Sequence, residues 1–155
     1  MITYSDDNEI LLSCTKDMVG KIIIPNGVKK IASHAFKDCY EISEIILPDT
    51  ISQIQSQAFS NCTSLEEINI PKEVKEIPYE CFSGCINLHT ISLPSQLLEI
   101  ASRAFSNCQS LTTILLPDSI RNLGYEAFKN CCNLCKILIP NGISSISSET
   151  FSGCE

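Results

Sequence analysis

The chain has 155 residues, 44% of them hydrophobic, and a formal net charge of −7. This length suits one domain, and the apolar content is sufficient for a continuous core, which argues against a disordered chain. The acidic balance argues against nucleic acid, whose binding needs a basic face, and against an electrostatic attachment to anionic membranes.

The first 18 residues differ from the rest of the chain. Two short apolar segments, residues 1–4 and 10–13, flank a polar stretch and predict a β-hairpin. We interpret residues 1–18 as a capping hairpin, because the end of a stack of repeated units exposes core unless it is covered. The N-terminus lacks the basic-then-apolar order of a signal peptide, and no segment approaches the ~20 apolar residues of a bilayer span.

From Val19 onward the sequence repeats every 23 residues. Its pattern is L-x-x-I-x-[IL]-P-x-x-[VIL]-x-x-I-x-x-x-A-F-x-x-C-x-x. The core positions of all six units are apolar residues, Ala or Cys, with Thr150 as the exception. The units cover residues 19–41, 42–64, 65–87, 88–110, 111–133 and 134–155. The phenylalanine row is Phe36, Phe59, Phe82, Phe105, Phe128 and Phe151, and the cysteine row is Cys39, Cys62, Cys85, Cys108, Cys131 and Cys154.

Within one unit, Ile68 and Ile70 alternate with polar residues, which predicts a short strand with one buried face. Pro71 ends that strand because proline has no N–H to donate to a sheet. The following segment 78–83 is expected to form a short helical or 3-10 turn that buries Cys81 and Phe82. Stacked units of this kind bury one continuous core and pair their strands in parallel, about 4.8 Å apart.

These residues resemble the BspA-like leucine-rich-repeat family over residues 19–155, through the I-x-[IL]-P, A-F and C signatures. The resemblance implies an α/β repeat solenoid: a right-handed leucine-rich-repeat superhelix with a parallel β-sheet on the concave side and short helical or 3-10 turns on the convex side. It also implies a cell-surface or secreted protein of bacteria or parasitic protists, with adhesion to host surface or matrix proteins as its role. No signal peptide or anchor in this chain matches that location.

The cysteine row has two interpretations, a metal or redox site and a row of packed thiols. We expect reduced, buried thiols, because free cysteine packs as a small apolar residue and a disulfide needs closely facing Cβ atoms. Cys131, Cys132 and Cys135 have a spacing that could suggest zinc, but they are expected to point in different directions. We therefore predict no metal and no cofactor.

The sequence also gives no sign of an enzyme. His89 and Cys135 are two units apart, roughly 10 Å at the strand spacing, which is too far for a nucleophile and its base. His34 occupies a turn position with no partner expected beside it, and no phosphate-binding or hydrolase motif occurs.

The strand residues between core positions are expected to face outward on the concave side, and several are apolar. One interpretation is simply that such residues favour strands; the other is a partner-binding groove. We favour a non-catalytic protein-binding module. Its predicted contacts are Ile46, Glu66, Glu67, Asn69, His89, Leu115 and Leu138.

The alternative function is a structural or self-assembling segment. The last unit is expected to present an uncovered apolar side on which a second copy could stack, giving a homodimer. The residues predicted for this contact are Leu134, Ile137, Ile139, Ile143, Ile146 and Phe151.

Overall fold

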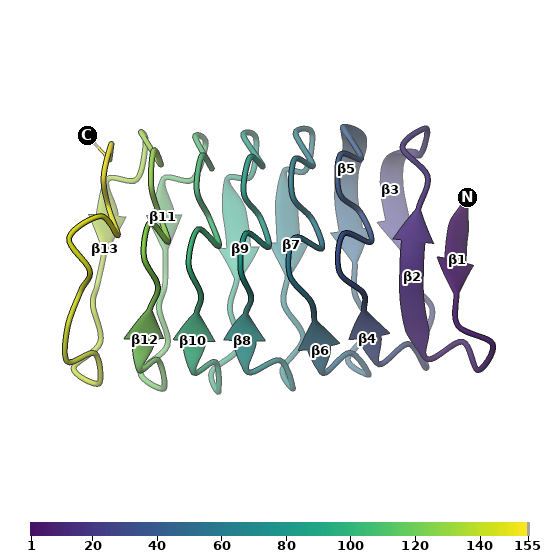
Figure 1. The fold of residues 1–155 in the computed structure, drawn as a ribbon, viewed down its shortest axis with the longest axis horizontal. Helices are drawn as coiled ribbons and strands as arrows, with labels where there is room; N and C mark the ends of the chain where they lie inside the picture. The colour runs from purple at the N-terminus through teal and green to yellow at the C-terminus, as the bar shows by residue number, and fades with distance from the viewer. Residues whose placement is uncertain (155) are drawn as a thin grey trace.

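Each 23-residue unit forms one coil of a parallel β-solenoid, and the coils lie side by side along the longest axis of the molecule (Figure 1). The computed structural model describes residues 1–154. The first five coils each contribute one strand to each of two rows, and the sixth contributes one to the first row. The first row, which we call the first ladder, is β3 (Val19–Ile23), β5 (Glu41–Ile46), β7 (Glu67–Asn69), β9 (Thr90–Ser92), β11 (Thr113–Ile114) and β13 (Lys136–Ile137).

The second row, the second ladder, lies on the opposite side of each coil (Figure 1). It consists of β2 (Ile10–Cys14), β4 (Lys30–Ile31), β6 (Gln53–Ile54), β8 (Glu76–Ile77), β10 (Glu99–Ile100) and β12 (Asn122–Leu123). The sequence did not predict this second ladder. Its strands are mostly two residues long, too short for an alternating pattern to be recognised.

Strand pairing follows the sequence period. Ile45 pairs with Ile68, and Ile68 with Ile91, so these residues face the one 23 positions later; the start of β3, before a register shift, is offset by one residue. The pairing is continuous over β3-β5-β7-β9 and again over β11-β13, while the second ladder pairs as β2-β4-β6 and β8-β10-β12. The predicted parallel stacking of the units is therefore confirmed.

The chain begins with β1 (Ile2–Tyr4), which pairs antiparallel with β2. β2 then pairs in parallel with β4, so this hairpin is continuous with the second ladder. The division into a cap over residues 1–18 and repeats over 19–155 stays a prediction, and residue 155 lies outside the described residues.

The predicted helical or 3-10 turns are wrong: residues 1–154 contain no helix, and the fold is all-β. In the third coil the amides of Cys81, Ser83 and Cys85 close local turns, each onto the carbonyl three residues before it. The amides between them donate instead to the next coil, from Glu80 to Ser102, from Phe82 to Ala104 and from Gly84 to Ser106, at 2.8–3.2 Å. A helix would need these same amides for its own carbonyls, so inter-coil bonding excludes it.

This alternation also requires unusual backbone angles. Glu80 and Gly84 adopt φ values of 51° and 77°, in the left-handed region, and the equivalent residues of most other coils do the same. At the second of these positions every coil has Asp, Asn or Gly, the residue types that tolerate this conformation best. That row consists of Asp38, Asn61, Gly84, Asn107, Asn130 and Gly153.

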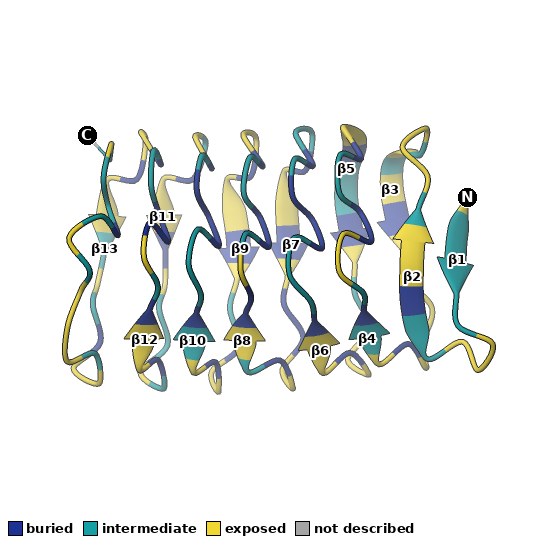
Figure 2. Ribbon diagram, in the orientation of Figure 1, coloured by how far each residue is buried: buried dark blue, intermediate teal, exposed yellow. Residues whose placement is uncertain are grey.

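The core fills the space between the two ladders and the turns (Figure 2). Phenylalanines 36 to 128 are fully buried, and neighbouring rings of the row from Phe36 to Phe151 are nearly parallel, with centroids 5.2–5.5 Å apart. Two predicted core positions are exceptions. Val19 is exposed because a register shift between Gly20 and Lys21 places it opposite the exposed Glu41 instead of the buried Ile42, and Ile146 is exposed in the sixth coil.

Candidate functional site

The outward side of the first ladder, here called the ladder face, carries the predicted contacts. The strand residues alternate, so that Ile68, Ile91 and Ile114 point into the core while the residues next to them face solvent. Among the apolar predicted residues, Ile46, Leu115 and Leu138 are 40%, 74% and 65% exposed. The polar predicted contacts, Glu66, Glu67, Asn69 and His89, are exposed as well.

The predicted residues do not form one continuous pocket. Ile46, Glu67 and Asn69 line a small hollow near the N-terminal end of the ladder face. His89 and Leu115 line a second, and Leu138 lines a third beside Asn141. Glu66 lies outside all three hollows. The ladder face is thus a row of separate shallow depressions.

The second hollow is the largest of the three, at about 490 Å³. Its base is apolar, formed by the buried Ile91 and the partly buried Leu93, and Leu115 stands at its side. Its remaining lining is polar: His89, Thr90, Ser92, Thr112 and Thr113. The His89 ring nitrogen Nδ1 lies 3.0 Å from the Thr90 hydroxyl, which orients the imidazole along the face. We name this depression the threonine hollow.

Charge is unevenly distributed along the ladder face. Lys21 Nζ lies 2.9 Å from Glu44 Oε1 and compensates that carboxylate. Glu66 and Glu67, in the next coil, form no ion pair within residues 1–154. Beyond them the threonine hollow has no carboxylate or cationic amine in its lining. The face therefore combines an uncompensated acidic section with a neutral, partly apolar section.

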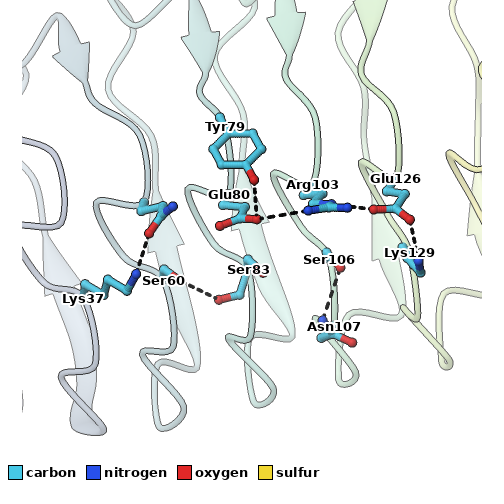
Figure 3. A network of polar contacts seen from close by, with 11 residues as sticks. Lys37, Ser60, Tyr79, Glu80, Ser83, Arg103, Ser106, Asn107, Glu126 and Lys129 are labelled. Carbon is cyan, nitrogen blue, oxygen red and sulfur yellow. Dashed lines mark hydrogen bonds and ion pairs between the residues drawn. The ribbon is translucent and has the colours of Figure 1, made fainter.

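Sequence reasoning missed a polar network on the turn side of the solenoid (Figure 3). Arg103 lies between two carboxylates, with its Nε 2.5 Å from Glu126 Oε2 and an Nη 3.6 Å from Glu80 Oε1. The Tyr79 hydroxyl donates to Glu80, and Lys129 pairs with Glu126. Hydrogen bonds from Lys129 and Arg103 lower the pKa of Glu126. The sequence signal for this network was the alternation of charge at equivalent positions of successive coils, Glu80, Arg103 and Glu126. The network links neighbouring coils and does not form a reactive centre.

The cysteine row is buried from Cys39 to Cys131 and half-buried at Cys154, and its thiols are hydrogen-bonded. Cys85 Sγ lies 3.1 Å from the carbonyl oxygen of Phe59, in the preceding coil, and the thiols of Cys62, Cys108, Cys131 and Cys154 make the equivalent contact. Burial raises the pKa of Cys39 and of Cys131 to about 12. A thiol with so high a pKa is protonated at neutral pH and is a poor nucleophile and metal ligand.

The possible zinc spacing gains no support from the structure. Cys131 is buried, whereas Cys132 and Cys135 are exposed and lie against carbonyl oxygens of their own turn, those of Asn130 and Asn133. In the part of the chain that the structure describes, no group of His, Cys, Asp or Glu side chains could hold a metal ion. Over the same residues, no helix is long and apolar enough to cross a bilayer.

The residues predicted for self-association lie together in the sixth coil. Leu134 is buried, Ile146 is 44% exposed, and the other four, Ile137, Ile139, Ile143 and Phe151, are partly buried. The Phe151 ring stacks on Phe128 with a centroid distance of 5.5 Å, as the phenylalanine rings of the other coils stack on their neighbours.

Two ladders of parallel strands, a phenylalanine row and repeated turns define a leucine-rich-repeat solenoid. The family model described as the BspA type leucine-rich repeat region, in six copies, matches residues 15–134 and 75–155. The chain therefore belongs to the BspA-type leucine-rich-repeat family. No enzyme family is indicated, and a search of curated proteins finds no match.

Solved structures give the same result. A leucine-rich repeat protein from Bacteroides ovatus is 32% identical, with a TM-score of 0.88, and the match covers 99% of this chain and 43% of that one. One from Eubacterium ventriosum is 27% identical, with a TM-score of 0.80 and coverages of 99% and 48%. A leucine-rich cell surface protein from Faecalibacterium prausnitzii is 28% identical, with a TM-score of 0.57 and coverages of 90% and 46%. The chain thus spans less than half the length of each of these proteins.

Proposed function

We propose that this chain is a non-catalytic protein-binding module that engages its partner through the ladder face. The observation that carries the proposal is the exposure of large apolar side chains on a regular sheet surface, above all Leu115 and Leu138. Contiguous apolar residues on an exposed surface commonly mark binding sites. Membership of a bacterial leucine-rich-repeat family is consistent with such a module.

The rigidity of the ladder face suits this role. Its backbone is held by hydrogen bonds between coils, such as Glu66 N–H to Ser43 O and His89 N–H to Glu66 O, both 3.0 Å. A surface that is ordered before binding loses little conformational entropy on association. Adhesion at a cell surface, including contact with host surface or matrix proteins, is our more specific proposal. It is supported by the family and by the similarity to the Faecalibacterium prausnitzii cell surface protein.

The test is to use the purified chain as bait and to compare it with the double variant Leu115→Glu/Leu138→Glu. We expect the fold to persist, because both side chains already face solvent, and the binding of a captured partner to be abolished. The matched control is Leu12→Glu/Leu98→Glu, which changes two exposed leucines on the second-ladder side. A partner whose affinity is unchanged by the first pair, or reduced equally by both pairs, would contradict the use of the ladder face.

Self-association through the sixth coil is a second candidate. It is favoured by the exposed Ile146 and the partly buried Ile137, Ile139, Ile143 and Phe151 around it, because exposed apolar edges pair readily with another chain. Light scattering should then detect a concentration-dependent dimer that Ile146→Glu abolishes. A monomer at every concentration would exclude this candidate.

A further inference from the structure

We propose that the ladder face binds an extended, basic segment of a partner polypeptide, with one cationic side chain at Glu66 and Glu67 and one aliphatic side chain in the threonine hollow. This inference rests on the proposed function and specifies the chemistry of the partner. It follows from the uncompensated charge, the shape and lining of the hollow, and the distance between the two.

The charge of the face selects a cation. Glu66 and Glu67 are both exposed, and neither has an ion-pair partner within residues 1–154. In the neighbouring coil toward the N-terminus, Glu44 is compensated by Lys21, whereas Glu66 and Glu67 stand at consecutive positions without such a partner among the described residues. Two adjacent carboxylates on a chain of net charge −7 attract a cationic group and disfavour an acidic one.

The threonine hollow selects an aliphatic side chain next to a peptide backbone. Its base is Ile91 and Leu93, with the exposed Leu115 at its side, so an aliphatic group placed there would remove apolar surface from water. Thr112 and Thr113 border the same space, and their hydroxyls form no hydrogen bond within residues 1–154. Hydroxyls can donate to or accept from the amides of a bound polypeptide. No charged side chain lines the hollow, which makes it unsuitable for a second ion.

The spacing of these two subsites fits an extended chain. Glu67 pairs with Thr90 of the next coil, and Thr113 and Leu115 belong to the coil after that. Glu67 is therefore one strand spacing from the near side of the hollow, where Thr90 lies, and about two spacings, roughly 10 Å, from its far side, where Thr113 and Leu115 lie. In a polyproline-II conformation, residues three apart lie on the same side of the chain about 9.3 Å from one another. A cationic residue followed three positions later by an aliphatic residue would reach both subsites.

The experiment is a titration of the isotopically labelled 155-residue chain with synthetic peptides, followed by two-dimensional NMR. The first peptide is Ser-Arg-Pro-Pro-Leu-Ser with blocked ends; the second replaces its arginine by glutamate, and the third exchanges the positions of one proline and the leucine. We expect saturable shifts of the amides of Glu66, Glu67, His89, Thr112 and Thr113 with the first peptide only. No saturable shift on the ladder face, or equal affinity for the glutamate peptide, would overturn the proposal.

Two charge-matched variants separate a local contact from the general effect of net charge. Glu66→Gln/Glu67→Gln should weaken the first peptide about two- to fivefold, as expected for exposed ion pairs. Glu73→Gln/Asp49→Gln removes the same charge from exposed positions in the loops after Pro71 and Pro48, outside the hollows of the ladder face, and should leave its affinity unchanged. Equal weakening by both variants would refute a specific cation site.

The outcomes for the two proposals remain distinct. A partner that is lost with Leu115→Glu/Leu138→Glu, while none of the peptides binds, would sustain the protein-binding function and reject the basic segment. A partner unaffected by those leucine changes would reject the ladder face itself.

Discussion

Phe82→Ala should be among the most damaging single substitutions in this chain. Phe82 is fully buried in the third of six coils. Its ring stacks on Phe59 at 5.2 Å and on Phe105 at 5.4 Å, with interplanar angles of 5° on both sides. Alanine at this position would leave a cavity in the middle of the phenylalanine row.

We expect the free energy of unfolding to fall by about 3–5 kcal/mol, the range for a buried phenylalanine replaced by alanine. We expect a loss in the upper part of that range, because the surrounding backbone cannot move to close the cavity. Hydrogen bonds between coils hold it in place, such as Phe82 N–H to Ala104 O at 2.8 Å. Phe151 provides an internal comparison. It is partly buried and stacks within residues 1–154 on Phe128 alone, so Phe151→Ala should lose roughly half as much.

Urea unfolding followed by circular dichroism measures both values. The slope of the free energy with urea concentration must be checked as well, because a weakened interior coil can make the two ends of a repeat protein unfold separately. A loss below about 1 kcal/mol for Phe82→Ala would refute the reasoning, as would equal losses at the two positions, because rigid stacking predicts a large, position-dependent cavity cost.

Three further predictions concern the turns and the second ladder. Gly84→Ala should lower the free energy of unfolding by about 1–2 kcal/mol, because φ is +77° and the new Cβ would lie 2.3 Å from Asn61 Oδ1. Gly20→Ala, where φ is +69° and the space is open, should lower it less in the same urea assay, and the reverse order would contradict a role for the Asn61 contact. Glu126 has a lowered pKa in the folded state, so its carboxylate stabilises the fold above pH 4.5, and this stabilisation is lost as the pH falls through the folded-state pKa. Glu126→Gln should therefore flatten the acid side of a plot of urea midpoint against pH, and an unchanged acid side would contradict this role of Glu126. Burial and the neighbouring Glu99 raise the pKa of Glu76, so the charged carboxylate destabilises the folded state above pH 4.5. Glu76→Gln should therefore raise the urea midpoint at pH 7 and not at pH 3, and a gain at both pH values would contradict this charge effect.

The amino-acid sequence by itself determined the period, the core rows and the family. These features depend on which residues recur at equivalent positions, and the parallel register confirms the 23-residue spacing directly, for example between Ile45 and Ile68. The burial of the row from Phe36 to Phe128 also follows from the repeat, because a large apolar side chain at the same position of every unit is stable only in a shared core.

The candidate site was predictable only in part. Strand alternation was enough to identify Leu115 and Leu138 as exposed, because successive side chains of a strand point to opposite sides. That Leu115 joins His89 in one hollow while Leu138 belongs to another depends on side chains from neighbouring coils, which the sequence does not position.

Only the tertiary structure decided the form of the turns. Residues 78–83, predicted as a helical or 3-10 turn that buries Cys81 and Phe82, have a pattern that fits such a turn as well as the alternating turns of a coil, so the sequence pattern cannot distinguish them. Hydrogen bonds between coils decide which form the turn takes: the amide of Phe82, for example, donates to Ala104 O, 22 residues away in the chain. Bonds of this kind exist only when a neighbouring coil is present, which is why local sequence reasoning predicted helical turns and the stacked coils form alternating ones.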